Sequence, residues 1–103
     1  MERGMEMRMK DRANVFKAIA DVKRQRILRV LQKNETYAYR LAEETDIAQS
    51  SLSYHMKILC DSGLVERRED GKWTYYRISE HGSRRFIEEL ERLVRDYAEN
   101  GFR

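Results

Sequence analysis

The chain has 103 residues, a formal net charge of +3 and a charged fraction of 38%. This length predicts one domain over residues 1–103, because two domains would each be too small to bury a stable core. The longest apolar runs have three residues, against roughly 20 for a bilayer span and roughly 7–15 for a signal-peptide core. We therefore expect a soluble, cytoplasmic protein with no membrane partner.

Cys60 is the single cysteine, and proline is absent. One cysteine excludes a disulfide within the chain and leaves a thiolate zinc site without its second sulfur. The histidines, His55 and His81, add little metal-binding capacity. The sequence therefore predicts no metal site and no cofactor, and the lack of proline permits long helices.

Helical spacing of apolar residues predicts three helices in the first part of the chain. The first covers about residues 5–20. The second covers residues 22–32, with Asp21 as its N-cap. The third covers residues 37–45, with Thr36 as its N-cap.

A fourth helix is predicted at about residues 48–62, directly after a tight turn at Asp46-Ile47. Gly63 is expected to end this helix as a C-cap. Its apolar side chains recur at helical spacing and predict a buried face of Leu52, His55, Met56 and Leu59.

A β-hairpin and a last helix complete the chain. Two strands, at residues 64–68 and 73–78, flank the hairpin signal Asp70-Gly71. A loop of these two residues would pair Arg68 with Trp73 and Val65 with Tyr76. The inward side chains would then be Val65, Tyr76 and Ile78, and the outward ones Glu66, Arg68, Trp73 and Tyr75.

The last helix is predicted at about residues 81–98, with a wide apolar stripe. The whole order is α-α-α-α-β-β-α, mainly helical with a small β-hairpin. This order is typical of a winged helix-turn-helix with an added helix at each end, in which residues 48–62 form the recognition helix and residues 64–78 the wing.

Hydrogen-bond donors occupy the non-apolar positions of the predicted recognition helix. A solvated polar face would look similar, but a tight turn precedes this helix, a basic hairpin follows it, and no acid occurs before Asp61. Short hydroxyls, amides and cations in the first turns of such a helix suit the base edges of a DNA major groove. The predicted DNA-binding residues here are Gln49, Ser50, Ser51, Ser53, Tyr54 and Lys57.

The hairpin and the second helix supply the positive charge. Arg67, Arg68 and Lys72 are predicted to neutralise phosphates beside the groove. Residues 14–40 hold seven Lys or Arg against two acids. The excess positive charge of the chain is therefore concentrated around the second helix.

Over roughly residues 14–95 the chain resembles the ArsR/SmtB family of winged-helix repressors. Three segments carry the resemblance: Phe16-Lys17-Ala18-Ile19-Ala20-Asp21 with Arg24 and Arg26-Ile27-Leu28; Ile47 through Leu59; and Gly63-Leu64-Val65 with Gly71 through Ile78. The resemblance implies a homodimer that binds an imperfect inverted repeat near its own promoter and leaves it when an inducer binds. It places Gln49, Ser50, Ser53 and Tyr54 at the positions that contact bases and phosphates.

The resemblance also implies that the first and last helices form the dimer interface. The residues we expect there are Phe16, Ile19, Phe86, Leu90, Leu93 and Tyr97. Ala48 departs from the family pattern, because a capping serine is usual there, and this should weaken the start of the recognition helix by about 1 kcal/mol.

The sensor positions of the family are changed in this chain. Tyr37 and Tyr39 stand where arsenic-type members carry a Cys-x-Cys box. They either line a small-molecule pocket or fill the space of the missing box. The positions that match the zinc-type site hold Glu80, Gly82, Leu93 and Asp96, a poor zinc set without imidazole. The remaining candidates for an inducer are an unidentified small molecule and a redox signal.

The leading hypothesis is therefore a homodimeric repressor whose partner is double-stranded DNA. The alternative is a winged-helix module for protein–protein interaction, with outward Trp73 and Tyr75 as a contact patch. An enzyme is not expected, because the sequence has no nucleophile–base pair, phosphate loop or carboxylate pair in a plausible cleft.

Overall fold

The computed structural model describes the backbone of residues 13–100 and the side chains of residues 13–95. Residues 13–19 are helical, and the predicted start of this helix near residue 5 lies outside the described part. The later elements are α2 (Val22–Lys33), β1 (Thr36–Tyr37), α3 (Ala38–Thr45), α4 (Gln49–Asp61), β2 (Val65–Asp70), β3 (Trp73–Ile78) and α5 (Glu80–Asn100).

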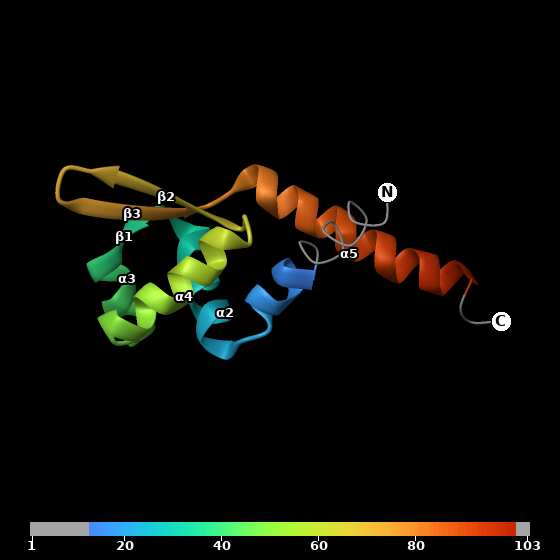
Figure 1. Ribbon diagram of the computed structural model, residues 1–103, viewed down its shortest axis with the longest axis horizontal. Coiled ribbons are helices and arrows are strands. Elements are labelled where there is room, and N and C mark those ends of the chain that lie inside the picture. Colours follow the sequence, from blue (N-terminus) through green and yellow to red (C-terminus); the bar gives the residue numbers. More distant parts are fainter. Residues whose placement is uncertain (1–12, 101–103) are drawn as a thin grey trace.

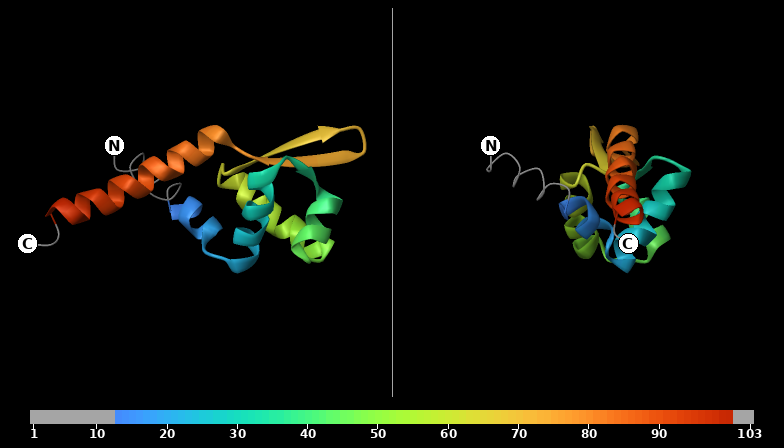
Figure 2. Two further views of the ribbon diagram at one scale, coloured as in Figure 1. Left: turned by 180° about the vertical axis from the view of Figure 1, so that it is seen from behind. Right: turned by 90° about the vertical axis from the view of Figure 1, so that its right-hand side faces the viewer.

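The helices α2, α3 and α4 form a compact body under a small sheet, and two elements extend from it (Figure 1). The β2–β3 ribbon extends at one end of the molecule, and α5 leaves the body at the other end, as the views in Figure 2 also show. This arrangement confirms the predicted winged helix-turn-helix. No helix among the described residues has the length and apolar character to cross a membrane.

The sheet has three antiparallel strands in the order β1-β3-β2, so the predicted two-stranded hairpin was incomplete. Thr36 pairs with Tyr76 and Tyr37 with Tyr75. Thr36 is therefore a buried strand residue, and its predicted role as N-cap of α3 was wrong. Tyr37 occupies the N-cap position and makes no side-chain capping hydrogen bond.

The hairpin register differs from the prediction by two residues. Asp70 pairs with Trp73, Arg68 with Tyr75 and Val65 with Ile78, so the loop is Gly71-Lys72. Gly71 has a φ of 61°, which suits the type II′ turn, where glycine supplies the positive φ at the first loop position. Because a shift of two residues keeps each side chain on its face, Val65 and Tyr76 are buried as predicted.

The core lies between α2, α3, α4 and the base of the sheet. The predicted apolar face of α4 is buried in full: Leu52, His55, Met56 and Leu59. It packs with apolar residues of the neighbouring elements, namely Ala18, Ile27, Leu31, Leu41, Ala42, Ile47, Leu64, Val65 and Tyr76. Burial of this face leaves the opposite side of α4 in solvent and fixes which residues it presents there.

The predicted tight turn between α3 and α4 is confirmed. Asp46 ends α3 in the left-handed conformation, with φ 57° and ψ 38°. The N–H of Ile47 donates to the carbonyl of Ala42 at 3.2 Å, which satisfies one of the last carbonyls of α3. The Ile47 side chain is buried, so this short turn fixes α4 relative to α3.

The start of α5 lies directly against the end of α4. Ser79 caps α5, because its hydroxyl accepts a hydrogen bond from the N–H of Gly82 at 3.0 Å. A Cβ on Gly82 would lie 1.8 Å from the carbonyl oxygen of Gly63. Only a residue without a side chain allows this approach of the two backbones.

Replacement of Gly82 tests this contact. In a helix, Gly→Ala ordinarily stabilises by about 1 kcal/mol. Here we expect Gly82→Ala to destabilise by about 1–3 kcal/mol, because the added methyl group meets backbone that must shift. Thermal unfolding measures the effect, with Ser83→Ala as the matched neighbour. A melting temperature of Gly82→Ala at or above that of the wild type would contradict the close approach.

Candidate nucleic-acid interface

The exposed face of α4 carries the polar residues singled out in the sequence. The side chains of Gln49, Ser50, Ser53, Tyr54 and Lys57 are exposed, and Ser51 is half-buried. Among them, Tyr54 is 63% exposed. The structure therefore presents amide, hydroxyl, phenol and ammonium groups along one side of a helix whose other side is fixed in the core.

Several of these groups are held by contacts within α4. The hydroxyl of Ser53 donates to the carbonyl of Gln49 at 3.2 Å, and Lys57 pairs with Asp61 at 3.0 Å. At the N-terminus, Ala48 provides no side-chain cap. The first N–H groups of α4 therefore have no side-chain cap from Ala48, and the positive end of the helix dipole there favours an anion such as phosphate.

A half-buried arginine fixes α4 to the preceding helices. The Arg24 side chain, 12% exposed, donates from Nε to the carbonyl of Ala18 at 2.6 Å and from Nη2 to that of Lys17 at 3.3 Å. Its Nη1 lies 3.0 Å from Nδ1 of His55. Arginine can only donate, so Nδ1 of His55 accepts and the ring is neutral, with its proton on Nε2.

This contact explains a buried histidine in the recognition helix. Burial lowers the pKa of His55, and the neighbouring cations Arg24 and Lys23 lower it further, against the opposing carboxylate of Asp21. Asp21 itself accepts the backbone N–H of Arg24 at 3.0 Å as the N-cap of α2. That hydrogen bond holds the pKa of the Asp21 carboxyl below its usual value. The sequence identified Asp21 as a cap but gave no signal for the link from Arg24 to His55.

The three predicted wing cations differ in their surroundings. Arg67 pairs with Tyr76 across the ribbon and Arg68 pairs with Tyr75, so the two arginines lie on opposite faces. Arg67 forms an ion pair with Glu69. Lys72 sits in the exposed loop and has no ion pair with any residue that the structure describes. A DNA backbone that met this hairpin would therefore reach Lys72 without displacing an acid.

Arg68 is the more restrained arginine. It forms an ion pair with Glu35 at 2.6 Å and approaches Asp70 at 3.8 Å. Its guanidinium also lies 4.5 Å above the ring of Tyr75, a cation–π contact. The hydrogen bond from Arg68 keeps the pKa of the Glu35 carboxyl below its usual value. This pair ties the wing to the segment before α3.

The positive surplus around α2 is only partly available to a ligand. Arg24 binds backbone carbonyls, Arg26 donates to the carbonyl of Thr45 at 3.0 Å, and Arg40 pairs with Glu44 at 3.1 Å. The cations of this region that remain exposed without an ion pair among the described residues are Lys17, Lys23, Arg29 and Lys33.

The two tyrosines at the altered sensor positions have different surroundings. Tyr37 makes edge contacts with Trp73 and Tyr75, at ring-centroid distances of 5.1 and 6.1 Å. Tyr39 is exposed. Within the described part of the chain, no three His, Cys, Asp or Glu side chains are placed to hold a metal ion.

Cys60 lies half-buried near the end of α4. Burial raises the pKa of its thiol, against the opposing positive charge of Arg67. Its thiolate is therefore disfavoured at neutral pH, whereas a reactive cysteine needs a lowered pKa.

The residues expected at a dimer interface fall into two groups. Phe16, Ile19 and Phe86 are half-buried within the chain, and the rings of Phe16 and Phe86 lie 5.1 Å apart. Leu90 and Leu93 are exposed on α5 together with Ile87 and Val94. The side chain of Tyr97 lies outside the described residues.

A short turn between two helices, a solvent-facing second helix and a β-ribbon wing define a winged helix-turn-helix domain. Residues 21–67 match the family model described as bacterial regulatory protein, arsR family. The arsenical resistance operon repressor of Bacillus subtilis is 42% identical over 66 residues, which are 63% of this chain and 63% of that repressor. The transcriptional repressor SdpR of the same organism is 35% identical over 64% of this chain and 73% of its own length.

A solved structure shows the same fold. It is the homodimeric winged helix-turn-helix DNA-binding domain from Mycobacterium bovis, described as a possible ArsR-family transcriptional regulator. It is 31% identical, with a TM-score of 0.74 over 95% of this chain and 89% of that one. This chain belongs to the ArsR family of bacterial regulatory proteins.

The neutral His55 predicts a pH dependence of stability. The unfolded chain takes up a proton near its ordinary pKa of about 6.5, but the folded chain resists it. Stability should therefore be full above that pH and fall as pH drops from about 7 towards the lower folded pKa, by up to about 1.4 kcal/mol per unit of pKa difference. The carboxyl groups with lowered pKa values change the folding stability only at more acidic pH.

Thermal unfolding of wild type, His55→Gln and His81→Gln between pH 7.5 and 5.5 measures this effect. His55→Gln should have a lower melting temperature at pH 7.5 and a flatter profile. The control His81→Gln, at an exposed position, should keep the wild-type slope. An unchanged slope in His55→Gln would show that another group is responsible.

Proposed function

We propose that the protein is a homodimeric, sequence-specific DNA-binding repressor whose helix α4 enters the major groove of an inverted-repeat operator. One observation carries the proposal: α4 presents a row of polar donors to solvent while its apolar face is fixed in the core. A major groove admits one α-helix, and amide, hydroxyl and cationic groups on its first turns are the groups that read base edges.

The comparisons support DNA binding and repression. The two Bacillus subtilis relatives are named as repressors, and the Mycobacterium bovis domain is described as a DNA-binding domain. The chain spans 63% of the first of these repressors, so operator choice and direction of control are proposed here from the α4 surface together with these relatives.

The α5 helix supports the dimer. It has 21 residues and extends beyond the body (Figure 1). Ile87, Leu93 and Val94 are each more than half exposed. An apolar stripe of this length in solvent is typical of an interface between subunits, and the Mycobacterium bovis domain is homodimeric. The α4 helices of the two subunits would then lie about one turn of DNA apart, and the half-sites would be about 10–11 base pairs apart, centre to centre.

The alternative of a protein-interaction module rests on Trp73, which is 53% exposed. Its neighbour Tyr75 is half-buried between Tyr37 and Arg68. The aromatic patch is therefore smaller than the sequence suggested. If the module hypothesis held, Ser53→Ala and Tyr54→Ala would leave partner binding intact, and DNA would not compete with the partner.

Fluorescence anisotropy with DNA from upstream of its own gene tests the proposal. Gln49→Ala should lose about 1–3 kcal/mol of discrimination between this DNA and random DNA. Lys57→Ala should weaken binding to both alike and lower the salt slope by about one. Arg84→Ala, a charge-matched change at the start of α5, should alter neither property.

Two results would contradict the proposed function. One is the absence of sequence preference at about 150 mM salt; the other is a monomer at micromolar concentration, measured by sedimentation. Equal effects of Gln49→Ala on specific and random DNA would contradict the role given to that residue.

The Glu35–Arg68 pair predicts a variant that binds DNA more tightly than the wild type does. Glu35→Gln removes the charge that holds Arg68 and should free the guanidinium for phosphate. We expect binding to random DNA to tighten by about twofold to tenfold at low salt, with a steeper salt slope. Glu43→Gln, at another exposed acid, serves as the control for net charge. Weaker binding by Glu35→Gln would instead show that Glu35 positions Arg68 for DNA.

A further inference from the structure

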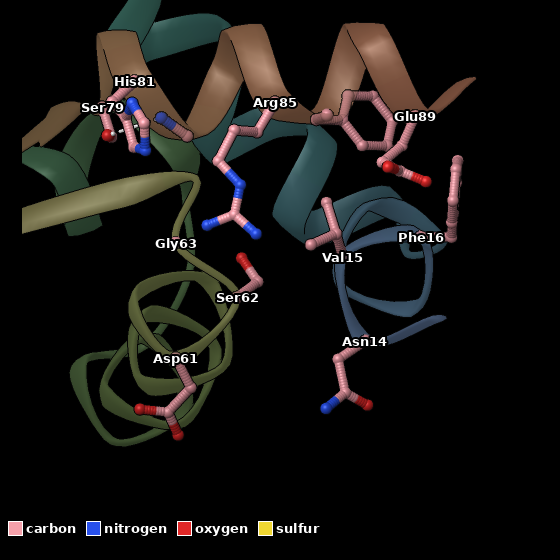
Figure 3. A pocket seen from close by; sticks show the side chains of 12 residues that line it. Asn14, Val15, Phe16, Asp61, Ser62, Gly63, Ser79, His81, Arg85 and Glu89 are labelled. Carbon is pink, nitrogen blue, oxygen red and sulfur yellow. Dashed lines mark hydrogen bonds between the residues drawn. The ribbon is translucent and has the colours of Figure 1, made fainter. Parts of the chain in front are cut away.

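A cavity of about 420 Å³ lies where three elements meet: the helix at residues 13–19, the end of α4 and the first turns of α5 (Figure 3). The predicted DNA-binding residues do not line it. Its walls combine apolar side chains (Val15, Phe16 and Phe86) with polar ones (Asn14, Ser62, His81 and Arg85). This size falls within the range of small-molecule sites, about 300–1,000 Å³.

Arg85 reaches from α5 into this cavity, towards Ser62 (Figure 3). It forms no hydrogen bond or ion pair with any residue that the structure describes. The other arginines of α5 with described side chains do have partners: Arg84 with Glu80 at 2.7 Å, Arg92 with Glu89 at 3.4 Å and Arg95 with Glu91 at 3.4 Å. The residue four positions before Arg85 is His81, where Arg84 and Arg95 have a glutamate at that spacing.

The acids near the cavity do not neutralise Arg85. Asp61 pairs with Lys57 at 3.0 Å, and its carboxylate points away from Arg85 (Figure 3). Glu89 lies on the far side, beside Phe16 (Figure 3), and approaches Arg92 of its own helix at 3.4 Å. The charge facing the interior near Ser62 is therefore positive.

The rest of the cavity suits an apolar group. Val15 faces the Arg85 side chain across the space (Figure 3), and the Phe16 and Phe86 rings form one wall, with centroids 5.1 Å apart. At the rim between α4 and α5, the backbones of Gly82 and Gly63 approach so closely that no side chain fits between them. The site thus has a cation at one end and an apolar wall at the other.

We propose that this cavity binds a small organic carboxylate, with the carboxylate on the Arg85 guanidinium and an aromatic or branched apolar group against Val15 and Phe86. A guanidinium presents two parallel N–H groups to a carboxylate, a geometry that a neutral amide does not reproduce. The ligand would touch both the end of the recognition helix and α5. Its role as an effector rests on the proposed function, whereas its binding does not.

Calorimetry on the full chain tests the site, with 4-phenylbutyrate as the probe and its neutral amide as the matched compound. We expect saturable binding of 4-phenylbutyrate, weakened at least tenfold for the amide and in Arg85→Gln. Arg85→Lys should keep part of the affinity, and Arg84→Gln should keep all of it. Thermal unfolding of each variant without probe verifies that the fold is retained.

Two calorimetric results would overturn the site. One is equal affinity of wild type and Arg85→Gln for the carboxylate. The other is no saturable binding of the carboxylate to the wild type.

The same probe in the DNA anisotropy assay tests the effector role separately. We expect 4-phenylbutyrate to change the affinity of wild type for upstream DNA at least threefold and to leave that of Arg85→Gln unchanged. Binding of the probe with no change in DNA affinity would overturn the effector role while the site stands. If the wild type bound no DNA at all, the proposed function would be contradicted. Calorimetry would still show whether the cavity binds the carboxylate.

Discussion

The position of the recognition helix depends on Arg24. Its guanidinium joins the last carbonyls of the helix at residues 13–19 to the ring of His55 on α4. Hydrogen bonds from a charged donor contribute about 1.5–3 kcal/mol each, and solvent screens them less where the side chain is only 12% exposed. One residue of α2 therefore binds both the helix at residues 13–19 and α4.

Several arginines that contribute to the positive charge of the chain are held by contacts within the fold. Arginines that the sequence assigns to a positive patch are used inside the fold, as with Arg26 on the carbonyl of Thr45. Wing arginines are paired with wing or neighbouring acids. Contact with phosphate would have to displace these acids, except at Lys72.

The sequence predicted the helices well because their signal is local and periodic. The α4 stripe of Leu52, His55, Met56 and Leu59 fixed both the helix and its buried face. The strand β1 was missed because two residues cannot show an alternating pattern, and their pairing with Tyr75 and Tyr76 is decided about 40 residues later in the chain. The hairpin register was wrong because Asp-Gly and Gly-Lys are both acceptable loops, and a positive φ at Gly71 fits either of them.

The candidate site was predictable in its residue types and unpredictable in its contacts. Residues on the exposed side of α4 follow from the helical period, but the Glu35–Arg68 and Arg24–His55 pairs join residues more than 30 positions apart. No pattern in one sequence reports such pairs. The Arg85 cavity likewise arises from the meeting of three distant segments.

Hydrogen–deuterium exchange of the full chain, with and without its upstream DNA at about 150 mM salt, tests most directly whether α4 reads DNA. If it does, DNA will slow exchange in residues 49–57 and around the hairpin loop at residues 70–73, and it will leave the far end of α5 unchanged. Slowed exchange confined to α5 or to residues 74–78 of β3, with α4 unchanged, would contradict it.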